Sequence, residues 1–356
     1  MYGMKTQERI DSNISANHQP TKACGETGVS SLELNSTFDY PASWYFFSTV
    51  RELRRGPVAK DAVGKRLVGF ETESGDVAVM ENRCIHMGAD LSHGCVVGET
   101  LQCSLHHWQF DTQGECVHIP ASEKIPSFAR LASFPVTVRN GNVYFFLGRE
   151  TLFPLPFYEG CDLGDLVAAK PFTEHIECPW YMVGANGVDV QHFSIAHDRV
   201  LQGSPQVTHP HPRAHRAVCH FRIAGNSLGD RLTKHFGGND VHMEITNWSG
   251  TIILVRSTLA KTETFGFLSI VPLRKNQTTV HITVMAKAKD GLVNQQLLDP
   301  LRAAVRRILI RKFLRSDIER LKGTRFSPHT LIDADREFAD YFHWLSNITR
   351  IDSSTA

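Results

Sequence analysis

The chain lacks both a long hydrophobic run and an excess of charge of either sign. Its 356 residues include 38 Lys and Arg against 37 Asp and Glu, which gives a formal net charge of +1. Nucleic-acid-binding proteins typically carry a basic stripe or patch, which this balance does not provide. No stretch approaches the roughly 20 consecutive apolar residues of a membrane helix. We therefore expect no nucleic-acid partner and no membrane-spanning segment.

Cysteine is also scarce. Eight cysteines in a chain of this length are too few for a disulfide scaffold. The first 37 residues are polar and lack the apolar stretch of a secretory signal, so we predict a cytoplasmic location. Histidine, by contrast, occurs 18 times. Because imidazole is a common metal ligand, clusters of Cys and His are interpreted first as metal chemistry.

Changes in composition predict an α+β protein with two folded domains. Between Trp44 and Gly148 the apolar runs are short and broken by turn residues, including Asn140 and Gly141, which is typical of a small antiparallel β domain. Four later runs rich in β-branched and aromatic residues predict a larger antiparallel sheet flanked by helices. The predicted segments are a disordered arm (1–37), a β domain (38–150), a linker (151–165) and a second domain (166–350).

The first candidate site lies in the β domain. Cys84 and His86 form C-x-H, and Cys103 and His106 follow as C-x-x-H. Two thiolates and two imidazoles on paired loops are suitable ligands for zinc or for a [2Fe-2S] cluster. The spacing alone leaves both open.

A second candidate site lies in the second domain. The string NGVDVQHFSIAH places Asp189, His192 and His197 at spacing D-x-x-H-x-x-x-x-H. On a helix Asp189 and His192 share one face, whereas the five residues from His192 to His197 overshoot one turn and predict an irregular stretch between the two histidines. Two histidines and one carboxylate form the facial triad of non-heme Fe(II) oxygenases, which leaves positions open for O2 and substrate.

The residues around both sites resemble those of one family. C-x-H-x-G-A-x-L-x-x-G followed by C-x-x-H-x-W-x-F-x-x-x-G-x-C is similar to the Rieske signature of ring-hydroxylating oxygenases, and N-x-x-D-x-x-H-x-x-x-x-H is similar to their iron motif. The chain thus resembles the terminal oxygenase (alpha) component of Rieske non-heme iron oxygenases, of the aminopyrrolnitrin oxygenase and ketosteroid hydroxylase or cholesterol desaturase types. His107 stands where relatives often have Gly.

The resemblance implies roles for individual residues. Cys84, His86, Cys103 and His106 would hold a Rieske [2Fe-2S] cluster, and His192 and His197 would hold a mononuclear Fe(II). Asp189 would connect a cluster histidine of the neighbouring subunit to His192. The third iron ligand is an acid on a later helix. The candidates are Asp290, Asp299, Asp317, Asp333, Asp335 and Asp340, with Glu319 as the nearest competitor; the segment RSDIERLKG favours Asp317.

The same resemblance implies an activity and partners. The enzyme would be a monooxygenase or desaturase that uses O2 and electrons from NAD(P)H, delivered through a separate reductase with or without a ferredoxin, on a hydrophobic cyclic molecule such as an arylamine or a steroid. It implies a homotrimer in which the cluster of one chain serves the iron of the next. The alternatives are a non-catalytic Rieske electron-transfer or metal-sensing protein and, in another class, a zinc hydrolase.

One helix allows a further interpretation. Between residues 300 and 320 apolar side chains recur at helical spacing among arginines and lysines: Leu301, Val305, Ile308, Leu309 and Leu314. Such a stripe is found in the core or on a membrane surface, and its basic face could also dock an acidic ferredoxin. We predict that the stripe is core, because the helix must deliver Asp317 to the iron, and we do not expect membrane association.

Overall fold

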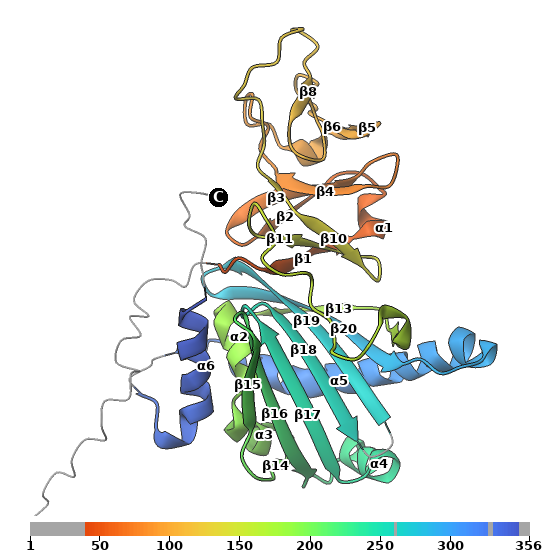
Figure 1. The fold of residues 1–356 in the computed structure, drawn as a ribbon, viewed down its shortest axis with the longest axis vertical. Helices are drawn as coiled ribbons and strands as arrows, with labels where there is room; N and C mark the ends of the chain where they lie inside the picture. The colour runs from red at the N-terminus through yellow and green to blue at the C-terminus, as the bar shows by residue number, and fades with distance from the viewer. Residues whose placement is uncertain (1–39, 260–261, 327–329, 349–356) are drawn as a thin grey trace, which may run out of the picture.

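Three small sheets precede one large sheet along the chain, and helices cover one face of the large sheet (Figure 1). The computed structural model describes residues 40–259, 262–326 and 330–348. The predicted arm, residues 1–37, lies outside the described residues, as do residues 349–350 of the predicted second domain.

The N-terminal domain is built from short antiparallel strands, as the sequence predicts. Its sheets have the orders β1-β11-β10, β2-β3-β4-β9 and β5-β6-β7-β8. The bounds are β1 Trp44–Thr49, α1 Val50–Leu53, β2 Val58–Ala62, β3 Lys65–Glu71, β4 Val77–Glu81, η2 Leu91–His93, β5 Cys95–Val97, β6 Thr100–Gln102, β7 Gln109–Phe110, β8 Cys116–His118, β9 Ser133–Phe134, β10 Val136–Arg139 and β11 Asn142–Phe146.

The predicted Asn-Gly turn joins β10 to β11. Asn140 and Gly141 both have positive φ, 51° and 71°. Arg139 pairs with Asn142 across the turn. Two consecutive positive φ values are those of the type I′ turn, which matches the twist of a hairpin. The sequence prediction of a hairpin here is confirmed.

The second domain contains a nine-stranded antiparallel sheet. Its main order is β12-β20-β19-β18-β17-β16-β14, with β13 paired to β20 and β15 to β16. The strands are β12 Leu166–Ala168, β13 Phe172–Ile176, β14 Arg199–Leu201, β15 Gln206–His211, β16 Ala214–Ile223, β17 Asp240–Trp248, β18 Ile252–Leu259, β19 Thr262–Arg274 and β20 Gln277–Lys287. The helices are η3 Leu163–Asp165, α2 Trp180–Asn186, α3 Val190–His197, α4 Leu228–Gly237, η4 Asn294–Leu298, α5 Asp299–Leu321, η6 Asp333–Asp335 and α6 Arg336–Ser346.

The two faces of this sheet have different partners. One core cluster joins sheet residues such as Phe221 and Ile282 to helix residues such as Phe193 and Tyr341. A second cluster joins the opposite face to the N-terminal domain, through Trp44, Tyr144 and Phe146 among others. Because apolar side chains are buried on both faces, the sheet is the layer on which the helices and the N-terminal domain are assembled.

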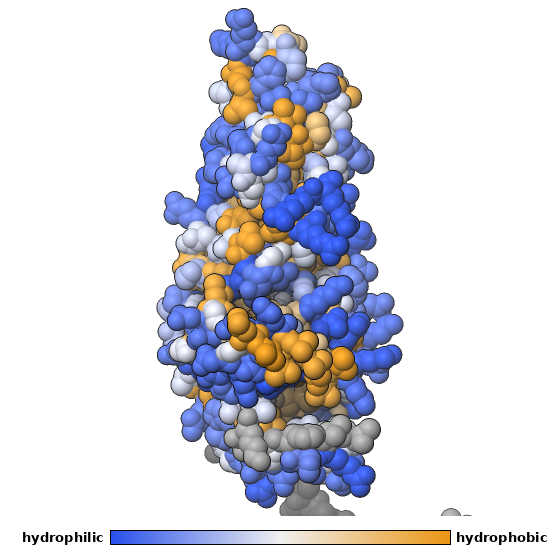
Figure 2. All heavy atoms as spheres, turned by 90° about the vertical axis from the view of Figure 1, so that its right-hand side faces the viewer, coloured by the Kyte–Doolittle hydropathy of each residue, from blue (hydrophilic) through white to orange (hydrophobic). Residues whose placement is uncertain are grey.

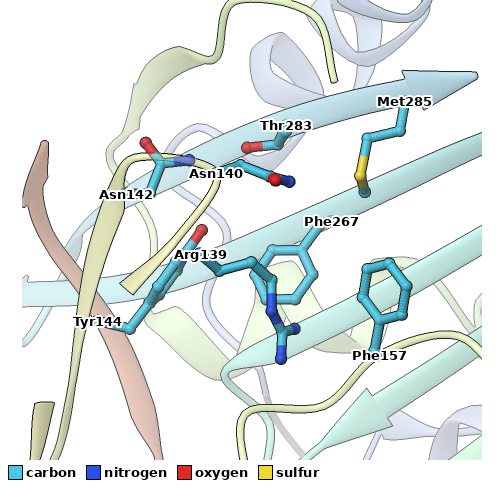
Figure 3. Close-up of a pocket in the computed structure, with 8 residues that line it drawn as sticks. All are labelled: Arg139, Asn140, Asn142, Tyr144, Phe157, Phe267, Thr283 and Met285. Atoms are coloured by element: carbon cyan, nitrogen blue, oxygen red, sulfur yellow. The ribbon is translucent and has the colours of Figure 1, made fainter. Parts of the chain in front are cut away.

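The segment between the domains is held in place by one half-buried arginine. Arg139 donates hydrogen bonds to the carbonyls of Leu155 (2.6 Å) and Pro156, and its guanidinium lies over the rings of Phe157 and Phe267. Figure 3 shows it beside a small pocket between the β10–β11 hairpin and the large sheet. The predicted linker is therefore packed against both domains.

The long helix α5 corrects one prediction. Leu301, Val305, Ile308 and Leu309 are exposed rather than buried, and Leu314 is half-buried. The buried face of α5 carries Ala303, Asp317 and Leu321 instead. Its N-terminal part projects past the edge of the sheet, so the outer face has no layer to pack against (Figure 1). Among the described residues no helix is long and apolar enough to cross a membrane.

Candidate metal centres

The first centre is formed by two loops with the same backbone hydrogen bonds. After β4, the amide of Cys84 donates to the carbonyl of Ala89 (2.9 Å), and its carbonyl accepts from the amide of Gly88 (2.8 Å). After β6, the amide of Cys103 donates to Trp108 (2.9 Å), and its carbonyl accepts from His107 (3.0 Å). Each loop therefore closes a tight turn that fixes one cysteine.

Equivalent positions in the two loops require the same unusual backbone. Gly88 has φ +72° and His107 has φ +57°. This left-handed region is accessible to glycine and strained for most other residues. His107 therefore occupies a position whose backbone favours glycine.

The four candidate ligands differ in burial. The thiols of Cys84 and Cys103 are buried, whereas His86 and His106 are exposed, with ring centroids 4.6 Å apart. His86 stacks on the buried ring of Trp108 at 4.5 Å. Burial raises the pKa of the Cys84 thiol to about 11. Two buried sulfurs and two exposed imidazoles fit a Rieske cluster, in which the cysteines hold one iron and the histidines hold the other.

The exposed imidazoles have apolar neighbours in their own loops. Ile85 and Met87 flank His86, and Leu105 precedes His106. All three side chains are exposed, Met87 to 66%. The surface around these two candidate ligands therefore presents apolar side chains to any partner.

The second centre begins with the short helix α3. Asp189 is its N-cap residue, and one carboxylate oxygen accepts from the amides of Gln191 (3.1 Å) and His192 (3.2 Å). An aspartate at this position satisfies amides that have no partner within the helix. The cap thus explains where α3 starts and how it places His192 and His197.

A backbone hydrogen bond selects the tautomer of His192. Its Nδ1 lies 2.6 Å from the carbonyl oxygen of Asp189. Since a carbonyl can only accept, Nδ1 carries the proton and Nε2 keeps its lone pair. Burial lowers the pKa of His192, against the opposing effect of Asp317, so the ring is held neutral. A neutral imidazole with a free Nε2 is a suitable metal ligand.

Asp317 completes the site from α5. Its Oδ1 lies 2.6 Å from Nε2 of His197 and 3.9 Å from Nε2 of His192. The three residues offer ligand atoms that all lie within 4.8 Å of one another. Apart from these contacts with one another, the three buried atoms have no hydrogen-bond partner among the described residues. Unpartnered buried polar atoms are costly, and a cation bound between them would satisfy all three.

The structure separates Asp317 from the other acids that the sequence offered. Glu319, the nearest competitor, is exposed and pairs with Arg315. Asp299 is buried but pairs with Arg302 near the other end of α5. In the described part of the chain, the acid brought to His192 and His197 is Asp317.

Two residues at this site were missed by the sequence reasoning. Phe313, one helical turn before Asp317, stacks on His197 with ring centroids 3.6 Å apart. Arg199 donates to the carbonyl of His197 (2.8 Å) and to Asp230 (2.9 Å). The i, i+4 relation to Asp317 could have indicated Phe313. The pairing of Arg199 with Asp230, 31 residues away, has no signal in a single sequence.

Comparisons with known proteins agree with this geometry. The family model for the Rieske [2Fe-2S] domain matches residues 43–129. Cholesterol 7-desaturase nvd 1 of Ciona intestinalis is 31% identical over 163 residues, 44% of this chain and 35% of the relative. Aminopyrrolnitrin oxygenase PrnD of Pseudomonas fluorescens is 31% identical over 173 residues, 46% of this chain and 47% of the relative. The chain therefore matches less than half the length of either relative.

The fold similarity extends over most of the chain. The solved structure of NdmA of Pseudomonas putida CBB5 with caffeine has a TM-score of 0.66 and 19% identity, and the match covers 85% of this chain and 89% of NdmA. The predicted α+β fold class, with a β Rieske domain followed by a sheet flanked by helices, is confirmed. The similarity to Rieske oxygenases that the motifs predicted is confirmed as well: the chain carries a Rieske [2Fe-2S] domain and has the fold of NdmA.

Proposed function

We propose that this protein is the terminal oxygenase component of a Rieske non-heme iron system, which uses O2 and externally supplied electrons to mono-oxygenate or desaturate a hydrophobic cyclic molecule. One observation carries the proposal. The chain combines a Rieske domain with a buried set of two histidines and one aspartate, whose inward atoms have no described polar partner outside the set. A non-catalytic electron-transfer or metal-sensing protein with a vestigial second site would have no reason to keep His192, His197 and Asp317 together.

Four residues are assigned to the cluster and three to the iron. Cys84, Cys103, His86 and His106 would hold the [2Fe-2S] cluster, which supplies one electron at a time. His192, His197 and Asp317 would hold Fe(II), which supplies the centre for O2 chemistry and leaves positions open for O2 and substrate. Every residue for which the sequence spacing suggested a ligand role is among these seven, except Asp189.

The surroundings of the iron site favour an apolar substrate. His197 is stacked on Phe313, and the ring of Phe193 lies 4.3 Å from that of His192. Phe193 in turn packs against Phe221 of the sheet. Aromatic walls exclude water from the reacting atoms and bind hydrophobic molecules. Two similar proteins are named for cholesterol and aminopyrrolnitrin, and we place the substrate in this range of sterol-like and arylamine molecules.

A homotrimer would bring the two centres together. The cluster loops and α3 lie toward opposite ends of the long axis of one chain (Figure 1). His86 and His106 are exposed, and Asp189 is only half-buried, so a neighbouring chain can reach it. Asp189 would then be a positioning residue between the neighbour's cluster histidine and His192. Electrons would come from NAD(P)H through a separate reductase, with or without a ferredoxin, in the cytoplasm.

Metal analysis of two matched variants tests the proposal. Anaerobically purified protein should contain about three iron atoms and about two acid-labile sulfides per chain. Asp317→Ala should lose about one iron and all oxygen uptake while the EPR signal of the reduced cluster is unchanged. The exposed Glu319→Ala, on the same helix, should resemble the wild type.

Other results would contradict it. Zinc in place of iron at the buried site would favour a hydrolase. A wild-type protein with a reducible cluster and no mononuclear iron would favour a non-catalytic electron carrier. If Asp317→Ala retains its iron and turns over, the ligand assignment on α5 is wrong.

A further inference from the structure

A stripe of aliphatic side chains on the outer face of η4 and α5 has no role in either centre. Leu297, Leu301 and Ile308 are 64%, 58% and 64% exposed. Val293, Val305 and Leu309 are exposed beside them, at the spacing of successive helical turns. Figure 2 shows a large apolar patch on the side of the molecule toward which these elements project. We call the six residues the apolar stripe.

The shape of the stripe is convex and projecting. Figure 1 shows η4 and the first turns of α5 extending past the edge of the large sheet, away from the remainder of the molecule. A protein partner would need a groove shaped to this helix. A flat, fluid surface needs no groove that is complementary to the helix. A projecting helix can also contact such a surface without steric clashes from the rest of the molecule.

The charge of the segment favours an anionic surface. Residues 291–315 contain six Arg or Lys and one acid, Asp299. Asp299 is fully buried and paired with Arg302, so it contributes little negative charge at the surface. Exposed Arg311, Lys312 and Arg315 follow the stripe along α5. Arg311 pairs with Glu174 and Arg315 with Glu319 at the surface, so Lys312 is the residue of the three whose charge is not offset by an ion pair within the described part of the chain.

We propose that the apolar stripe docks this protein on the surface of an anionic lipid bilayer. The aliphatic side chains would enter the boundary between headgroups and acyl chains, and the basic residues would face lipid phosphates and carboxylates. An amphipathic basic helix binds membranes in this way without crossing them. The expectation that the protein avoids membranes rested on a buried stripe, and the structure leaves the stripe exposed.

Vesicle flotation of the full-length holoprotein tests this proposal. Wild-type protein should float with phosphatidylcholine vesicles that contain about 30% phosphatidylserine, and bind pure phosphatidylcholine more weakly. Leu301→Glu combined with Ile308→Glu should weaken binding at least about tenfold, because two charges replace inserted side chains. Lys312→Gln should weaken binding to the anionic vesicles by about fivefold and leave binding to neutral vesicles unchanged.

The matched control places the same charges elsewhere. Phe128→Glu combined with Ile332→Glu changes two side chains that are 62% and 66% exposed but lie outside the stripe. This variant should float like the wild type. Retained thermal stability and cluster absorption in all variants would show that folding is intact.

Two outcomes would overturn the proposal. Wild-type protein that does not bind anionic vesicles rules it out directly. If the stripe variants change the mass of the assembly in light scattering while vesicle binding is unaffected, the stripe contacts a second copy of the chain instead. Flotation requires no turnover, so either failure leaves the oxygenase proposal untouched.

Discussion

A single strained residue beside the cluster offers a test at the scale of one side chain. His107 has φ +57°, in the left-handed region, where a residue other than glycine costs about 1 kcal/mol or more. We expect His107→Gly to raise the thermal unfolding temperature slightly and to retain the cluster absorption. His107→Val should lower both, because a β-branched residue fits this backbone worst. Equal stabilities for Gly and Val would mean that the turn relaxes.

Substitutions of Asp189 can separate the capping of α3 from the electron-transfer role proposed for its charge. Its carboxylate caps α3, and its backbone carbonyl orients His192. Asn is also a good N-cap residue, so Asp189→Asn should keep the stability and both metals but lose turnover by orders of magnitude if the charge serves electron transfer. Asp189→Ala should in addition lose about 1 kcal/mol of stability. Single-turnover oxygen uptake and denaturant unfolding measure the two effects, and an active Asp189→Asn would refute the electron-transfer role.

At the scale of elements, an ion pair connects α3 to α4. Arg199 bonds the last carbonyl of α3 and also Asp230, whose carboxylate accepts from Ser227 in the capping box of α4. Both side chains are nearly buried, 13% and 11% exposed. Removing one partner of a buried pair leaves an uncompensated charge and costs about 3–5 kcal/mol.

We therefore expect Arg199→Met to destabilise the protein strongly and to weaken Fe(II) binding, since His197 loses its anchor. Asp230→Leu alone should also destabilise, but the double variant should recover part of the loss. Denaturant unfolding and anaerobic Fe(II) titration measure the two effects. Additive losses in the double variant would show that the pair is not coupled.

The elements that sequence predicted best are those with local signals. The Asn140-Gly141 turn, the runs around Phe221 and Ile282, and the helix that carries Asp317 all follow from residue type and spacing within one segment. The outer face of α5 was predicted wrongly because helical spacing shows which side chains share a face, not whether a layer lies against it. The overshoot from His192 to His197 predicted an irregular stretch between the two histidines, and this prediction was wrong: both lie in the continuous helix α3, and the break lies between α2 and α3, where Asp189 caps α3.

The candidate ligands were likewise visible in sequence motifs, except for the choice among the acids. Asp317 and Glu319 differ by two positions, which on a helix places them on different faces. Only the packing of α5 against α3 decides which acid faces the histidines. The contact of Phe313 had a local signal in its i, i+4 relation to Asp317, whereas the pairing of Arg199 with Asp230 joins distant segments and was not predictable.

At the scale of the whole molecule, a buried histidine links the two domains. His281 of β20 stacks on Phe46 of β1 at 3.5 Å and bonds Thr173. Burial lowers its pKa to about 4, with a smaller effect of Lys60. The unfolded chain therefore binds a proton at higher pH than the folded protein does. The contribution of the neutral His281 ring to the free energy of unfolding is complete above about pH 6.5 and is lost as the pH falls toward 4.

We expect the unfolding temperature to fall between about pH 7 and pH 5, and less steeply in His281→Leu, which removes a contribution of up to about 3 kcal/mol. His215 is buried with a pKa of about 4 as well, so part of the slope should remain. The exposed His118→Leu is the control. A slope unchanged in His281→Leu would show that this ring does not govern acid stability.

The aliphatic side chains of Ile85, Met87 and Leu105 around the exposed cluster histidines have a kinetic consequence. Encounters steered by opposite charges slow steeply as salt is added, because ions screen the attraction over about 10 Å. Association through aliphatic contacts is not accelerated by long-range attraction. Its rate is therefore lower and depends little on ionic strength. We expect the rate of cluster reduction by its redox partner to change little between low and physiological salt in stopped-flow measurements. A steep decline would place the docking charges elsewhere on the molecule. For an oxygenase, this indifference would keep electron supply steady while the ionic composition of its surroundings varies.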